Sequence, residues 1–149
     1  MGWDSGGMAG AGILNEVNIE GSVALVTGAN RGLGRHFVTQ LLDRGAARVY
    51  ASARTPSPVD GAIPLALDIT DQESIAAAVL AAPDVTLLIN NAGISTGTRL
   101  IDGDMARIRQ EMETHFFGTL GVIRAFAPVL RRNGGGAILN ILSALWPIR

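Results

Sequence analysis

The chain has 149 residues, of which 48% are hydrophobic and 17% are charged, and its formal net charge is −1. This length and composition predict one globular domain with a large buried core. The near-neutral charge offers no basic patch for nucleic acid or an anionic membrane, and the absence of cysteine excludes disulfides, thiolate metal sites and cysteine nucleophiles.

Residues 1–20 are rich in glycine and show no hydrophobic periodicity, so we expect them to form a disordered tail. They contain no basic segment followed by an apolar core, which argues against a secretory signal. No apolar run reaches the roughly 18 residues of a membrane span. We therefore expect a cytoplasmic protein with a single domain over residues 21–149.

A glycine-rich turn follows the first predicted strand, which the apolar residues 23–27 form. The helix after the turn has Phe37, Leu41 and Leu42 at inward-facing positions and ends at Gly45. Glycine lets the backbone approach phosphates closely, and the free N–H groups at the start of the helix attract negative charge. The turn therefore predicts a site for the pyrophosphate of a dinucleotide, and it reads Thr27-Gly28-Ala29-Asn30-Arg31-Gly32-Leu33-Gly34.

Apolar strands then alternate with helices. Residues 48–52 and 62–67 are the second and third predicted strands, and Pro64 favours an edge position for the third. Thr70 and Glu73 have the spacing of a capping box, which predicts that Thr70 caps the next helix.

The second half continues this alternation. Residues 85–89 are predicted as the fourth strand, residues 104–132 as a long helix and residues 137–142 as the fifth strand. The order predicts a doubly wound, Rossmann-type three-layer α/β/α fold with a mostly parallel sheet, which the chain follows to the fifth strand. An apolar stripe on the long helix predicts a buried core face or a subunit interface, and its members are Met105, Ile108, Met112, Phe116, Thr119, Ile123 and Phe126.

Four segments resemble the short-chain dehydrogenase/reductase family in their order and spacing. They are the glycine turn, Asp68, the run Asn90-Asn91-Ala92-Gly93 and the run Asn140-Ile141-Leu142-Ser143. The resemblance extends from about residue 20 to the last residue. It implies an NAD(P)-dependent oxidoreductase that transfers hydride between a nicotinamide cofactor and a carbonyl or alcohol substrate, with residues 21–149 as the N-terminal part of its NAD(P)-binding domain.

The resemblance also assigns roles to residues of this chain. The three glycines would shape the pyrophosphate turn, Asp68 would bind the adenine, and Ser143 would hold the substrate oxygen during hydride transfer. The cofactor-binding residues implied in this way, or predicted from charge, are Gly28, Asn30, Arg31, Gly32, Leu33, Gly34, Arg54, Asp68, Ile69, Asn91, Ala92 and Gly93.

The chain departs from the family pattern in its catalytic residues. The family's proton donor is the tyrosine of a Tyr-x-x-x-Lys motif that follows the serine, but this sequence contains no lysine and only one tyrosine, Tyr50. We therefore expect a fragment that is itself inactive. His115 stands where members commonly carry an asparagine, and we expect it to be a locally hydrogen-bonded helix residue without a catalytic role.

Charge predicts the choice of cofactor. A site that prefers NAD usually has a carboxylate at the end of the second strand, where this chain has Ala53. Arg31 and Arg54 flank that position, and two guanidinium groups without a carboxylate favour the 2′-phosphate of NADP, with NAD as a possible second cofactor.

Several alternatives stay open at this stage. The chain could be a non-catalytic dinucleotide-binding or sensing module, or another Rossmann-type enzyme such as a methyltransferase. Asp68, Ser143 and the two arginines could also be ordinary strand-end or surface residues. His36 and His115 offer no metal-binding spacing, so we expect no metal. We expect a small-molecule carbonyl or alcohol substrate, and a homo-oligomer for a full-length parent.

Overall fold

The computed structural model describes residues 18–142. It confirms the doubly wound sheet: five strands lie in the order β3-β2-β1-β4-β5, and every pairing is parallel. Most of the predicted N-terminal tail lies outside the described residues, and within the described part Ile19 packs against the core.

The elements follow the predicted order. The strands are β1 (Val23–Thr27), β2 (Arg48–Ala53), β3 (Ile63–Ala66), β4 (Leu87–Asn90) and β5 (Ala137–Asn140). The helices are α1 (Gly32–Asp43), α2 (Gln72–Ala81), α3 (Met105–Met112), the π-helical turn η1 (Glu113–Gly118) and α4 (Thr119–Arg132).

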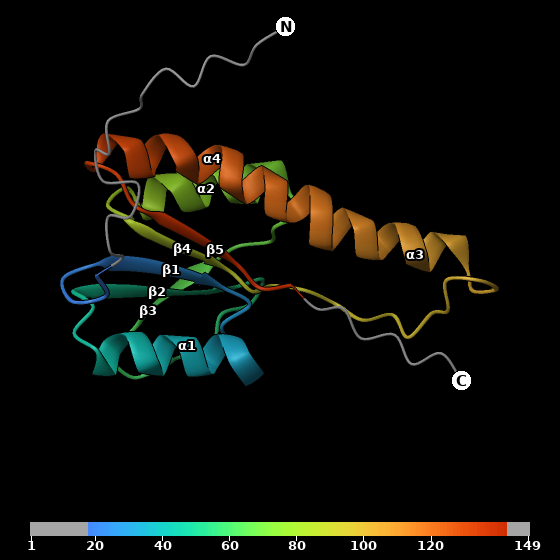
Figure 1. Cartoon of the computed structure of the whole chain (residues 1–149), viewed down its shortest axis with the longest axis horizontal. Helices are drawn as coiled ribbons and strands as arrows, with labels where there is room; N and C mark the ends of the chain where they lie inside the picture. The colour runs from blue at the N-terminus through green and yellow to red at the C-terminus, as the bar shows by residue number, and fades with distance from the viewer. Residues whose placement is uncertain (1–17, 143–149) are drawn as a thin grey trace, which may run out of the picture.

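Helices cover both faces of the sheet (Figure 1). In β1, Ala24 and Val26 belong to the core beneath α1, whereas Leu25 belongs to the core that α2 and α4 cover. The chain runs from β1 outward to β3 and then returns to place β4 on the other side of β1. This reversal is the topological switch point of the sheet, and open α/β sheets bind ligands in the crevice outside the carboxyl ends of the strands at that point, here β1 and β4. β3 is an edge strand, as Pro64 predicts.

The predicted capping box is wrong. Asp71, not Thr70, caps α2, and its carboxylate accepts a hydrogen bond from the Glu73 N–H at 3.0 Å. Thr70 instead donates its N–H and its hydroxyl to Asp68 Oδ1, at 2.9 and 2.7 Å. The Asp68 carboxylate therefore engages the threonine, and an ionised carboxylate is the stronger acceptor for a helix N–H.

The long helix forms, but its apolar stripe does not make one buried face. Phe126 is fully buried, whereas the side chains of Met105, Met112 and Phe116 are about half exposed. The η1 turn shifts the side chains that follow it around the axis. α3 extends beyond the end of the sheet (Figure 1), and within the described structure none of its residues is buried. Core burial is thus wrong for Met105, Met112 and Phe116, and the subunit interface stays a prediction.

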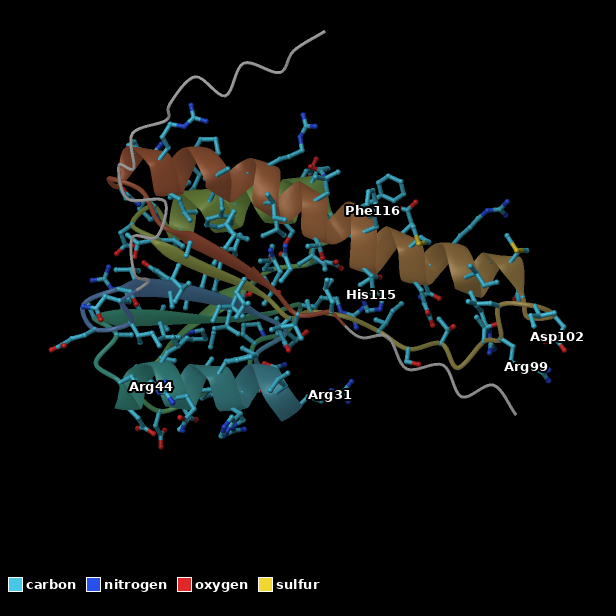
Figure 2. The ribbon with its side chains drawn as sticks, viewed as in Figure 1. Arg31, Arg44, Arg99, Asp102, His115 and Phe116 are labelled. Atoms are coloured by element: carbon cyan, nitrogen blue, oxygen red, sulfur yellow. The ribbon has the colours of Figure 1, made fainter. Side chains whose placement is uncertain are left out.

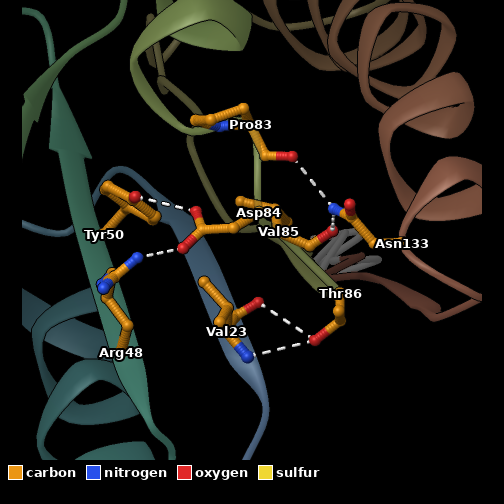
Figure 3. Close-up of polar contacts among 8 residues, drawn as sticks. All are labelled: Val23, Arg48, Tyr50, Pro83, Asp84, Val85, Thr86 and Asn133. Atoms are coloured by element: carbon orange, nitrogen blue, oxygen red, sulfur yellow. Dashed lines mark hydrogen bonds and ion pairs between the residues drawn. The ribbon is translucent and has the colours of Figure 1, made fainter.

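Polar side chains join the amino ends of the strands (Figure 3). Asp84, ahead of β4, accepts hydrogen bonds from Arg48 and from the Tyr50 hydroxyl, the latter at 2.8 Å. The side chain of Asn133 donates to two backbone carbonyls of the α2–β4 connection, at 3.0 and 3.1 Å. Burial, and then the hydrogen bond to Asp84, raise the pKa of Tyr50. The one tyrosine of the sequence is therefore a neutral donor at the edge of the sheet opposite the crevice.

Candidate functional site

All twelve residues predicted to bind a cofactor lie at or just beyond the carboxyl ends of β1, β2, β3 and β4. The parallel sheet places these four ends side by side at one edge. Ser143, the predicted substrate-positioning residue, lies outside the described residues.

The three glycines of the turn are required for different reasons. Gly28 and Gly32 have φ angles of +69° and +55°, in the left-handed region that favours glycine. A Cβ on Gly34 would lie 2.2 Å from the Gly28 carbonyl oxygen, and one on Gly28 would lie 2.8 Å from Ala92 Cα. At Gly32 no atom lies within 4 Å of such a Cβ. The turn is therefore closely packed against the protein at Gly28 and Gly34, whereas the space beside Gly32 is open.

The first turn of α1 fits an anion. Its N-cap, Arg31, makes no side-chain capping bond, and no acidic residue lies in the first turn. In contrast, the carboxylates of Asp71 and Asp104 cap α2 and α3. The first N–H groups of α1 therefore have no side-chain acceptor, and they lie beside the open side of the turn, where the half-exposed Leu33 also lies.

Asn91 joins the glycine turn to the end of β4. Its Nδ2 donates to the backbone carbonyls of Thr27 and Gly28, at 3.0 and 3.2 Å. The backbone N–H groups of Asn91 and Ala92 both donate to Thr27 Oγ1, at 3.0 and 2.9 Å. These four bonds hold the glycine turn against the end of β4, and contact of Asn91 and Ala92 with a cofactor stays a prediction.

Two segments that carry the family resemblance meet at the end of β4. Asn90 Nδ2 donates to Asn140 Oδ1 at 2.8 Å, and the two residues are register partners of β4 and β5. Asn90 is 5% exposed, and among the described residues its Oδ1 has no partner. This buried side chain fixes β5, which leads toward Ser143, against β4.

Contrary to the expectation from the sequence, the hydrogen bond of the His115 side chain is not local. Its Nε2 lies 2.7 Å from the carbonyl oxygen of Ile94, 21 residues away in sequence. A Cβ on Gly93 would lie 2.6 Å from His115 Cε1, so the ring occupies the space that glycine leaves. Figure 2 shows His115 on the side of the helix that faces the strand ends, with Phe116 on the other side. In the tautomer that carries a hydrogen on Nε2, this nitrogen donates to the Ile94 carbonyl; in the other tautomer it can accept from the Ile94 N–H, at 3.4 Å.

A second contact fastens the β4–α3 connection to the same helix. The Glu111 carboxylate accepts from the Thr96 hydroxyl and the Thr96 N–H, each at 2.7 Å. These two bonds lower the pKa of Glu111. The sequence alone does not predict this pair, because no local pattern joins two residues that are 15 positions apart.

Replacing His115 with alanine should free the connection near Gly93. We expect faster amide hydrogen exchange in the peptide that covers residues 91–98, because the donor to the Ile94 carbonyl is lost. His115→Asn should restore much of the protection, since its amide can donate to the same carbonyl. His36→Ala, on α1, is the matched control, and exchange in His115→Ala equal to that of the control would contradict the assignment.

Asp68 and Arg54 lie close enough to influence each other. The two hydrogen bonds from Thr70 lower the pKa of Asp68, and the positive charge of Arg54 adds a smaller effect in the same direction. Ile69 turns its side chain into the core, where a Cβ on Gly118 would lie 3.0 Å from Ile69 Cγ1. Only the backbone of Ile69 can therefore face a ligand. Asn30 directs its side chain toward the β2–β3 connection.

An apolar recess lies elsewhere among the described residues. It encloses about 560 Å³ between α1 and the neighbouring faces of β4 and β5, and apolar side chains form most of its wall. Two of them, Ile138 and Leu139 of β5, are 39% and 44% exposed. None of the twelve residues predicted to bind a cofactor lines this recess.

None of the helices within the described part of the chain combines the length and the apolar character that crossing a bilayer demands. Nowhere in residues 18–142 do three histidine or acidic side chains gather as a metal ion would require.

The comparisons with known proteins agree with this geometry. The family model described as short chain dehydrogenase matches residues 22–145. The uncharacterized oxidoreductase YusZ of Bacillus subtilis is 34% identical over 140 residues, which cover 81% of this chain and 48% of that protein. The chain spans about half the length of the curated relatives it matches.

Solved structures show the same fold. A short chain dehydrogenase from Burkholderia cenocepacia, in complex with NADP, is 49% identical with a TM-score of 0.78, covering 85% of this chain and 54% of that chain. A 3-ketoacyl-(acyl-carrier-protein) reductase from Brucella melitensis, complexed with NADH, is 28% identical with a TM-score of 0.75, covering 82% of this chain and 57% of that chain.

Proposed function

Because the chain belongs to the short-chain dehydrogenase family, we propose that it supplies the dinucleotide-binding part of an oxidoreductase that prefers NADP and acts on a carbonyl or alcohol substrate. The observation that carries this proposal is the uncapped first turn of α1 beneath the open glycine turn, with Arg31 and Arg54 beside it. The NADP complex of the Burkholderia cenocepacia relative supports it.

Each part of the crevice has a task in this proposal. The N–H groups of the turn and of α1 bind the pyrophosphate. Asp68 binds the adenine through its carboxylate, and the backbone of Ile69 assists. The bound nicotinamide supplies the hydride acceptor or donor. Ser143 holds the substrate oxygen, and the Asn90–Asn140 pair keeps β5, which precedes this serine, in register.

The preference for NADP rests on charge. β2 ends in Ala53, which carries no carboxylate to repel a 2′-phosphate or to accept from the ribose hydroxyls. Arg31 and Arg54 are exposed and free of ion pairs with other described residues. A guanidinium group binds a phosphate through two parallel hydrogen bonds, so either arginine can engage it. NAD, which lacks this phosphate, is the weaker ligand in the proposal.

The proton donor is proposed to lie beyond these 149 residues. The sequence has no lysine, and Tyr50 is bonded to Asp84 at the opposite edge of the sheet. We therefore expect the purified 149-residue chain to oxidise no NADPH with a panel of aldehydes and ketones, while the protein at its full natural length does. Absorbance of the reduced nicotinamide measures both. Steady turnover by the 149-residue chain would contradict this assignment.

Binding without catalysis is the second candidate, in which the protein holds a dinucleotide and transfers no hydride. The two functions differ in the full-length protein: a sensing module binds NADPH without oxidising it in the presence of any carbonyl of the panel. We also propose a cytoplasmic homo-oligomer, for which the exposed Met112 and Phe116 supply apolar contact area.

A further inference from the structure

The side chain of Asn30 spans from the glycine turn to the connection that follows β2. Its Nδ2 donates to the backbone carbonyl of Thr55 at 2.7 Å, and its Oδ1 accepts from the backbone N–H of Ser57 at 2.8 Å. The donor and the acceptor of the amide are thus both directed to the protein. Direct binding of the cofactor by Asn30 stays a prediction, and the bonds of its side chain point to a second role.

The connection has few other attachments. Thr55 and Ser57 are exposed, and within residues 18–142 the bonds to Asn30 are the only hydrogen bonds that hold residues 55–57 to the rest of the fold. Pro56 and Pro58 restrict the backbone on either side of Ser57. Two bonds to a stiff segment are enough to fix where the chain leaves β2, and Arg54 is the residue at that point.

We propose that Asn30 is a positioning residue for Arg54 and thereby determines how strongly the site distinguishes a dinucleotide that carries a 2′-phosphate from one that does not. This inference rests on the proposed function. A guanidinium group held near its binding position loses less conformational freedom when a phosphate binds. Asn30 also directly precedes Arg31 in the same turn, so its side-chain amide links the segment that carries Arg31 to the segment that carries Arg54.

The test measures dissociation constants of NADPH and NADH by fluorescence titration, with the protein at its full natural length. Asn30→Ala should lower the NADPH preference by roughly tenfold, because Arg54 is no longer held in place. Asn30→Asp keeps the acceptor for Ser57 but loses the donor to Thr55, so it should give a smaller decrease. Ser57→Ala is the matched control: it retains the backbone N–H, and the preference should not change.

A double-mutant cycle separates positioning from direct contact. In an Arg54→Ala background, Asn30→Ala should change the preference no further. An equally large change in that background would show that Asn30 acts without Arg54, and would overturn the inference. Equal weakening of NADPH and NADH by Asn30→Ala would also overturn it. Failure of the unmodified protein to bind either dinucleotide would refute the proposed function itself, a result that the first titration shows separately.

Discussion

Replacing Gly34 with alanine should strongly weaken dinucleotide binding and destabilise the fold. The added Cβ would lie 2.2 Å from the Gly28 carbonyl oxygen and 2.5 Å from Asn91 Nδ2. Neither atom can move freely, because the first belongs to the turn backbone and the second holds that backbone to β4. We expect the free energy of unfolding to fall by about 1–3 kcal/mol. NADPH affinity should fall roughly a hundredfold, since the turn must shift to accommodate the methyl group.

Gly134→Ala provides the matched control for this experiment. Gly134 lies between α4 and β5 with a φ of +91°, and a Cβ added there would have no atom within 4 Å. Alanine at this position should cost stability through its backbone conformation alone and leave cofactor affinity unchanged. Denaturant unfolding and NADPH titration of both variants measure the two effects. Unchanged NADPH affinity in Gly34→Ala would mean that the turn does not contact the dinucleotide.

Replacing Arg54 with alanine should remove most of the discrimination between NADPH and NADH. A hydrogen bond to a charged group contributes about 1.5–3 kcal/mol, which corresponds to roughly a tenfold to hundredfold change in affinity. Only NADPH should bind more weakly, because NADH has no 2′-phosphate for the guanidinium group to contact. The loss should shrink as salt concentration rises, since exposed charges are screened.

Arg44→Ala is the control that matches Arg54→Ala in charge. Arg44 lies at the C-terminal end of α1, whereas Arg31 lies at its N-terminal end near the crevice (Figure 2). Its removal alters net charge by the same amount without altering the proposed site. The ratio of the NADPH and NADH dissociation constants is the measurement. An unchanged ratio in Arg54→Ala, or an equal change in Arg44→Ala, would contradict a specific contact.

Local patterns were sufficient to predict the parallel sheet and the glycine turn. Each strand is a short apolar run bounded by turn residues, and the turn carries its glycines within one continuous segment. The edge position of β3 followed from Pro64 alone. These predictions depend on residues that are neighbours in sequence, so no tertiary information was needed for them.

The errors arose where a competing partner or a distant segment decides the outcome. Thr70 had a suitable spacing for a cap, but the Asp68 carboxylate that follows β3 takes its hydroxyl. The apolar stripe was predicted from the regular period of an α-helix, whereas η1 has a wider turn. No recognised signature in this sequence marks that turn. The side chain of Asn30 contacts residues 25 and 27 positions away, and that of His115 contacts a residue 21 positions away. Patterns within a single sequence do not reveal contacts at such separations.

The most direct test is a titration of isotope-labelled protein, at its full natural length, with NADPH while backbone amide signals are recorded by NMR. The amides of residues 28–34 should show the largest changes, followed by those around Asp68 and Arg54. A dinucleotide that fails to bind at millimolar concentration, or that binds and leaves the amides of residues 28–34 unchanged, would contradict the proposal that this turn holds the pyrophosphate.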